Sequence, residues 1–88
     1  MGQYTIRIEK SAQKDFQAHH KSWDKSIIKK IEEIFKDLAE HPESGVGKPE
    51  QLKYRFSGMW SRRINLEHRI VYEIIGDVVI IHSAMGHY

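Results

Sequence analysis

The segment from Lys48 to Arg69 concentrates positive charge around a few carboxylates and aromatic rings. It holds six lysine and arginine residues against two glutamates, whereas the rest of the chain holds eight basic and ten acidic residues. Clustered positive charge attracts a polyanion such as nucleic acid, although a charge run is also typical of a solvated surface. The formal net charge of +2 therefore hides a basic patch that is suited to binding phosphate groups.

Other kinds of chemistry find little support in the composition. The chain has no cysteine, which excludes thiolate catalysis, disulfides and cysteine-based zinc sites. The histidines before the C-terminus lack metal-ligand spacing, so we expect neither a metal nor a cofactor. Ser57 and Ser61 have no positioned His-Asp partnership in the sequence, so a nucleophilic hydrolase fits poorly.

The length and composition predict one globular domain that spans residues 1–88. A hydrophobic fraction of 40% and a charged fraction of 30% are those of an ordinary folded protein. No apolar run approaches the roughly 20 residues that span a bilayer, and Met1 to Lys10 lacks the pattern of a signal peptide. We therefore expect a cytoplasmic protein without membrane contact.

The first half of the chain predicts a strand and two helices. Tyr4, Ile6 and Ile8 alternate with polar residues, as in a half-buried strand. Ser11 is a candidate N-cap for a short helix. Asp24 or Ser26 can cap a longer helix that ends near His41, before Pro42. Its apolar stripe consists of Ile27, Ile31, Ile34, Phe35 and Leu38.

The second half predicts strands at Met59–Asn65, Arg69–Ile75 and Val78–Met85, with a shorter strand near Leu52–Arg55. Gly76-Asp77 supplies a two-residue turn between the last two strands. The resulting order is β-α-α-β-β-β-β. We expect an α+β fold, in which an antiparallel twisted sheet carries both helices on one face.

Strand alternation predicts which side chains share a face. If the Asn65–Glu67 loop has three residues, Arg63 lies opposite Arg69, and the two cations repel unless an anion lies between them. The same count places Arg69 opposite Ala84, with Tyr88 on that face. His87 then points away unless the chain bends near Gly86.

The motifs between Gly47 and Tyr72 resemble the YoeB/Txe toxins of the RelE superfamily. The resemblance is carried by Gly47–Lys53, Ser57–Ile64, Glu67–Tyr72 and the final His87-Tyr88 pair, and with the helices it covers essentially the whole chain. Met59 departs from the pattern, because an aromatic residue is common there. Members of this family are toxins of bacterial toxin–antitoxin modules that cut mRNA in the ribosomal A site and are silenced by an antitoxin.

The resemblance also implies roles for particular residues. It marks Glu50, Arg69, His87 and Tyr88 as the catalytic set, with Lys53 and Arg63 as contacts to phosphate. Lys48 and Arg62 match the motif without an assigned role. The strand parity of Arg62 is opposite to that of Arg63, so at most one of the two faces the phosphate. Trp60 and Tyr72 are expected in the core of the sheet.

These residue types suit RNA cleavage by attack of the 2′-hydroxyl on the adjacent phosphate. Glu50 is the candidate base, and arginine forks such as Arg63 and Arg69 can hold non-bridging oxygens. His87 is the candidate acid for the departing 5′-oxygen, although the roles of Glu50 and His87 can be exchanged. Tyr88 can donate a hydrogen bond to the phosphate or stack on a base.

The function expected from the resemblance is a ribosome-dependent, metal-independent endoribonuclease. Its partners would be mRNA, the ribosome, a cognate antitoxin and a second copy in a homodimer. Two alternatives stay open: a catalytically idle module that binds RNA or the ribosome, and a toxin of the ParE branch that inhibits gyrase. Retention of Glu50, Arg69 and the His87-Tyr88 end argues against the ParE alternative.

Overall fold

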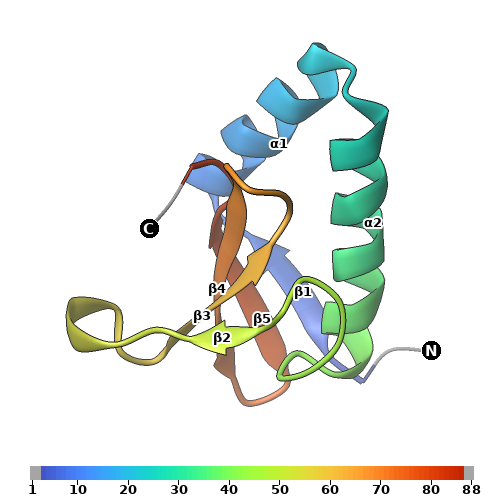
Figure 1. Cartoon of the computed structure of the whole chain (residues 1–88). Helices are drawn as coiled ribbons and strands as arrows, with labels where there is room; N and C mark the ends of the chain where they lie inside the picture. The colour runs from blue at the N-terminus through green and yellow to red at the C-terminus, as the bar shows by residue number, and fades with distance from the viewer. Residues whose placement is uncertain (1–2, 87–88) are drawn as a thin grey trace.

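The helices and strands follow the order expected from the sequence. The computed structural model describes residues 3–86, so His87 and Tyr88 lie outside the described part of the chain. Figure 1 shows α1 and α2 as a helical hairpin over the sheet. The elements are β1 (Thr5–Ile8), α1 (Lys10–Ser22), α2 (Lys25–Glu40), β2 (Glu50–Gln51), the 3-10 turn η1 (Tyr54–Phe56), β3 (Met59–Arg63), β4 (Arg69–Ile75) and β5 (Val78–Ser83).

The sheet has the strand order β1-β5-β4-β3-β2. Strands β2 to β5 pair antiparallel, whereas β1 pairs with β5 in parallel. The α+β class and the element order are therefore confirmed, but the sheet is mixed rather than wholly antiparallel. Short turns impose antiparallel pairing only on consecutive strands, and almost the whole chain separates β1 from β5.

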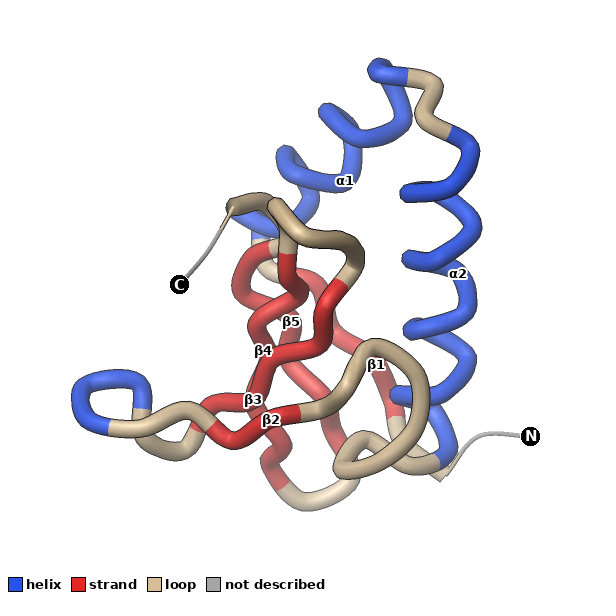
Figure 2. The backbone as a smooth tube through the Cα atoms, viewed as in Figure 1, coloured by secondary structure: helices blue, strands red, loops and turns tan. Residues whose placement is uncertain are grey.

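Several strand boundaries differ from the predicted ones. β4 has the predicted limits, while β3 and β5 end at Arg63 and Ser83, two residues early in each case. The short strand before them is Glu50–Gln51 rather than Leu52–Arg55. Tyr54 has a φ of +60°, which ends extended geometry there. In Figure 2, η1 projects from the body of the molecule on an arm that leaves the sheet after β2.

The two helices begin in different ways. Oδ1 of Asp24 accepts hydrogen bonds from the backbone N–H groups of Ser26 and Ile27, as expected of an N-cap. Ser11 does not cap α1, so that prediction was wrong: the N-cap is Glu9, two residues earlier, and the Ser11 hydroxyl donates to the carbonyl of His82 at 2.7 Å.

The core lies between the helices and one face of the sheet. The apolar stripe of α2 packs with Ala12 of α1 against Ile70 and Tyr72 of β4 and Val79 and Ile81 of β5. Alternate residues of β4 therefore point toward the helices, and Arg69 and Val71 point to the other face. We call that other side the open face of the sheet. None of the described helices is long and apolar enough to span a membrane.

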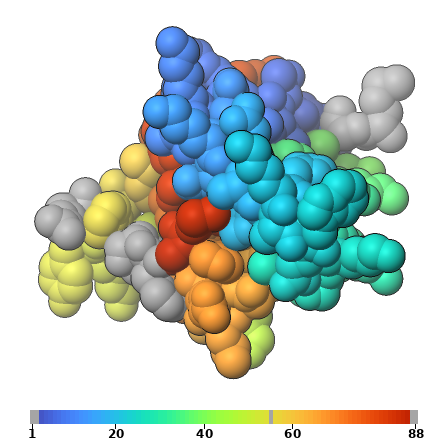
Figure 3. Space-filling view, turned by 90° about the horizontal axis from the view of Figure 1, so that it is seen from above, coloured from blue at the N-terminus to red at the C-terminus, as the bar shows by residue number. Residues whose placement is uncertain are grey.

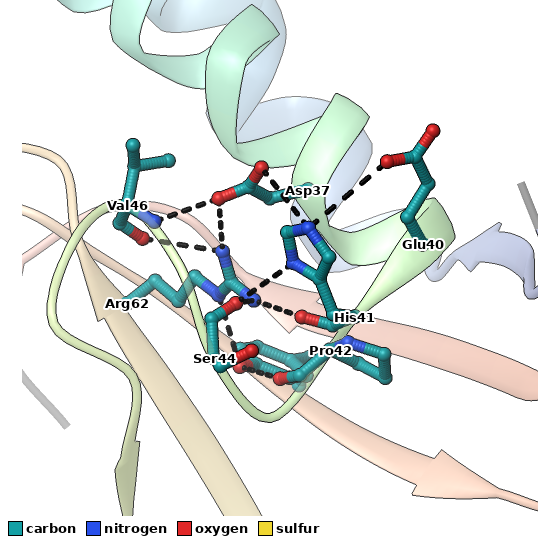
Figure 4. A network of polar contacts seen from close by, with 8 residues as sticks. Asp37, Glu40, His41, Pro42, Ser44, Val46 and Arg62 are labelled. Atoms are coloured by element: carbon teal, nitrogen blue, oxygen red, sulfur yellow. Dashed lines mark hydrogen bonds and ion pairs between the residues drawn. The ribbon is translucent and has the colours of Figure 1, made fainter.

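A fully buried arginine, Arg62, organises the loop after α2 (Figure 4). Its guanidinium makes five hydrogen bonds, equal to its number of N–H groups. Two go to the carbonyls of His41 and Ser44, at 2.8 and 2.6 Å. The others reach the hydroxyl of Tyr72, a carboxylate oxygen of Asp37 and the carbonyl of Val46.

The same network fixes the path of the loop from Pro42 to Gly47. The Tyr72 hydroxyl donates to the carbonyl of Pro42, and the Val46 N–H donates to Asp37, both at 2.7 Å. Gly47 has a φ of +84°, and a Cβ there would lie 2.9 Å from the carbonyl oxygen of Arg63. Only glycine allows so close an approach to β3. Since Glu50 follows Gly47 by three residues, the path of this loop determines where Glu50 lies beside β3.

We predict that replacing Arg62→Met strongly destabilises the fold. The change leaves three loop carbonyls, Asp37 and the Tyr72 hydroxyl without their donor, and breaking such a buried network costs about 3 to 5 kcal/mol of unfolding free energy. The neighbouring Arg63→Met is the matched control, since Arg63 is only half-buried and charges in contact with solvent contribute about 0 to 1 kcal/mol. Urea denaturation followed by circular dichroism measures both. Equal midpoints would contradict the structural role of Arg62.

We also predict a pH-dependent contribution from the cap of α2. The hydrogen bond from the Ser26 hydroxyl, together with the backbone N–H of Ile27, lowers the pKa of Asp24 below its ordinary value of 3.8. The stabilisation is therefore fully present above pH 3.8 and is lost as the pH falls through the lowered pKa of the folded protein. Asp24→Ala should lower the Tm at pH 7, with a difference from wild type that shrinks toward pH 2.

The variant Asp24→Asn is the control for this prediction. Its amide oxygen keeps a neutral acceptor for the same N–H groups, so its Tm relative to Asp24→Ala should not follow the titration of a carboxylate. A wild-type advantage over Asp24→Ala that stays constant from pH 7 to pH 2 would refute the assignment.

Candidate active site

Strand pairing brings Glu50, Ser61 and Arg69 together on the open face. Glu50 of β2 lies opposite Ser61 of β3, and Ser61 lies opposite Val71 of β4. The guanidinium of Arg69 reaches over this row, with Nη1 3.5 Å from Oε2 of Glu50 and 3.5 Å from the hydroxyl of Ser61. The side chain of Arg69 is 15% exposed and that of Glu50 is 59% exposed. The pair is thus anchored at the arginine and open to solvent at the carboxylate.

Arg63 and Arg69 lie directly opposite each other, as the three-residue loop predicts. The turn is stabilised by Asn65, whose side-chain oxygen accepts hydrogen bonds from the N–H groups of Glu67 and His68, both at 2.8 Å. Two facing cations favour an anion between or beside them. The Glu50 carboxylate supplies one negative charge to Arg69, which leaves this group of three side chains with a net positive charge.

Arg63 also lines a pocket of about 440 Å³ with Lys30 and Lys48. Ile64 and Leu66 contribute apolar walls. No carboxylate among the described residues lies within ion-pair distance of these three cations. The positive surface thus continues from the open face around the C-terminal end of β3, although Lys48 was given no role from the sequence.

Lys53 is separated from this cluster. It is exposed and immediately precedes η1, on the arm that projects from the sheet in Figures 1 and 2. Its side chain takes part in no hydrogen bond or ion pair recorded within residues 3–86. The described structure thus brings together Glu50, Arg63 and Arg69 of the predicted set, but not Lys53.

The C-terminal pairing differs from the predicted register. The ladder between β4 and β5 holds from Ile75 opposite Val78 to Tyr72 opposite Ile81, and then a β-bulge places Val71 opposite Ser83. Arg69 was expected opposite Ala84, and this prediction was wrong because the extra residue shifts the pairing by one. The parity count that pointed His87 away from Arg69 assumed an unbroken ladder and no longer applies. His87 and Tyr88 themselves lie outside the described residues.

The bulge brings the end of the described chain to Arg69. The backbone N–H of Arg69 donates to the carbonyl of Gly86 at 3.1 Å, and Gly86 has a φ of +71°.

The contacts of two groups near the site were missed from the sequence. Ser61 was considered only as a nucleophile, yet it is buried beneath Arg69 and accepts its hydrogen bond. His68 was considered only as a metal ligand, yet its ring contacts the C-terminal segment.

The chain is similar to known proteins in both sequence and fold. Residues 8–88 match the model of the family described as YoeB-like toxin of bacterial type II toxin-antitoxin system. The chain is 51% identical over 65 residues to Toxin YoeB of Escherichia coli K12, which covers 74% of this chain and 77% of that protein. Toxin YoeB of Streptomyces coelicolor is 44% identical over 70 residues, covering 80% and 83% of the two chains.

Solved structures are similar over almost the whole chain. A YoeB/ParE toxin from Agrobacterium tumefaciens superposes with a TM-score of 0.85 at 31% identity, covering 96% of this chain and 99% of that chain. The YoeB dimer from Staphylococcus aureus gives a TM-score of 0.83 at 37% identity, covering 98% and 99%. The YoeB-YefM complex from the same organism gives 0.81 at 36% identity, covering 97% and 98%.

Proposed function

Because this chain belongs to the YoeB-like toxins of bacterial type II toxin–antitoxin systems, we propose that it is a ribosome-dependent endoribonuclease that cuts mRNA in the A site. The observation that carries the proposal is the convergence of Glu50 and Arg69 on the open face, with Arg63 directly opposite Arg69. A carboxylate and two arginine forks at one place match what phosphodiester cleavage needs without a metal ion.

In this mechanism the 2′-hydroxyl of one nucleotide attacks the adjacent phosphorus, and the bond to the 5′-oxygen breaks. Glu50 accepts the proton of the attacking hydroxyl. Arg69 and Arg63 hold the non-bridging oxygens, whose negative charge grows in the transition state. Ser61 supports Arg69 from below, because its hydroxyl accepts a hydrogen bond from Nη1. Lys53 contacts a phosphate farther along the strand from its place on the projecting arm.

His87 protonates the departing 5′-oxygen, and Tyr88 hydrogen-bonds the phosphate or stacks on a base. Support for their place in the site comes from the residue before them, since the carbonyl of Gly86 accepts a hydrogen bond from the backbone of Arg69. An exchange of the acid and base roles between Glu50 and His87 uses the same groups. A pH profile of a Glu50→Gln variant would distinguish the two assignments.

The partners follow from the same proposal. A fold of this size has few residues with which to orient a flexible RNA strand. The ribosome therefore supplies the orientation, because it holds the message in a fixed conformation. Its RNA also contacts the cationic surface around Lys30 and Lys48. Solved relatives from Staphylococcus aureus form a dimer and a complex with YefM. We propose a homodimer here as well, and an antitoxin that covers the arginines of the open face.

We predict that Arg69→Ala slows single-turnover cleavage of ribosome-bound mRNA by about 30- to 1000-fold, or about 2 to 4 kcal/mol of transition-state stabilisation, with the fold intact. Cleavage is mapped by primer extension on a defined message with purified translating ribosomes. Arg7→Ala is the matched control, since Arg7 is exposed on β1, at the opposite edge of the sheet from β2.

An unchanged rate for Arg69→Ala would remove this arginine from the mechanism. If wild-type protein leaves the message intact, two other readouts identify the alternatives. Association with ribosomes indicates a binding module, and inhibition of DNA supercoiling indicates a gyrase toxin.

Deleting His87 and Tyr88 should abolish growth inhibition and keep antitoxin binding at least in part. The reason is that the deletion removes the proposed acid and leaves Glu50, Arg63 and Arg69 in place. Growth after induced expression and co-purification with the antitoxin are the two measurements. Full toxicity of the shortened chain would exclude His87 as the acid.

A further inference from the structure

The segment after β5, from Ala84 to Gly86, forms hydrogen bonds with α1, with the turn before β4 and with the first residue of β4. The N–H of Ala84 donates to Oδ2 of Asp15 at 2.9 Å, and the Ala84 carbonyl lies 2.7 Å from Nε2 of His19. The N–H of Gly86 donates to Nδ1 of His68 at 2.9 Å, while its carbonyl accepts from Arg69. Figure 3 shows this red segment between blue α1 and the orange segment that joins β3 to β4.

The two histidines have complementary roles, which follow from their partners. His19 faces a carbonyl, so its Nε2 carries the proton and donates. His68 faces an N–H, so its Nδ1 is the unprotonated acceptor. The rings contact each other edge to face, with centroids 4.9 Å apart. His19 is 3% exposed, so His68 packs against a buried ring.

We propose that Asp15, His19 and His68 are positioning residues for the nuclease reaction, which hold Ala84 and Gly86 so that the last two residues start beside Arg69. This inference rests on the proposed function. An acid group must lie within about 3 Å of the oxygen it protonates. A terminal segment without restraint visits many conformations, and a misplacement of about 1 Å can cost 100-fold in rate. The hydrogen bonds to both polar groups of Ala84 and of Gly86 restrain the point from which the last two residues continue.

The test compares two substitutions at His68. His68→Leu removes the acceptor, whereas His68→Asn places an amide oxygen close to the position of Nδ1 and keeps it. We expect His68→Leu to lower the single-turnover rate constant at saturating toxin by about 10- to 100-fold, with little change in the toxin concentration for half-saturation. His68→Asn should restore the rate to within a few fold of wild type.

The same logic applies to His19, where His19→Gln keeps a donor at the position of Nε2 and His19→Leu does not. His20→Leu is the control on α1, because His20 is the exposed neighbour of His19. Amide hydrogen exchange of the full chain, measured by NMR, gives a second readout that needs no ribosome. The Gly86 N–H should exchange at least about 10-fold faster in His68→Leu than in wild type or His68→Asn.

The outcomes separate this inference from the proposed function. If wild type cleaves, and His68→Leu cleaves equally fast although its Gly86 amide exchanges rapidly, the positioning role is overturned and the nuclease stands. Equal losses in His68→Leu and His68→Asn would overturn the role of the hydrogen bond. If wild type does not cleave on ribosomes, the proposed function fails and the positioning role fails with it, even where the Gly86 amide is protected.

Discussion

The buried guanidinium of Arg62 is the constraint on which the rest of the site depends. A charge removed from water must satisfy its donors within the protein, and here it does so with Asp37, Tyr72 and three loop carbonyls. This requirement fixes the path of the chain from α2 to β2, and hence the position of Glu50 in β2. Because neighbours on a strand face opposite ways, burying Arg62 directs Arg63 to the open face.

Much of the fold follows from local patterns in the sequence. Alternation along β3 and β4 and the three-residue loop at Asn65–Glu67 correctly predict Arg63 opposite Arg69. The helix stripe and the Asp24 cap are equally local signals. The parallel pairing of β1 and the bulge between β4 and β5 have no such signal. The first joins distant segments, and the second inserts one residue without a glycine to mark it.

The candidate site likewise contains residues that the sequence identified and contacts that only the structure shows. The resemblance assigned Glu50 and Arg69, and the structure adds that their side chains meet. The contacts of Ser61, Asp15, His19 and His68 could not be predicted, because they depend on neighbours that only the folded chain provides. His19 and Ala84 are 65 residues apart in sequence. No spacing rule connects such a pair, and an imidazole that binds backbone groups leaves no motif.

The contact between Glu50 and Arg69 has a consequence for the proposed reaction. In the protein without RNA, the Glu50 carboxylate lies 3.5 Å from the guanidinium of Arg69 and helps to orient it on the open face. A bound phosphate competes for the same fork of N–H groups, and its oxygens suit that fork at least as well. In the proposed reaction Arg69 turns to the phosphate and releases Glu50, whose carboxylate oxygens are then free to face the attacking hydroxyl. In this proposal, substrate binding frees the base at the moment when the arginine reaches the group whose charge must grow.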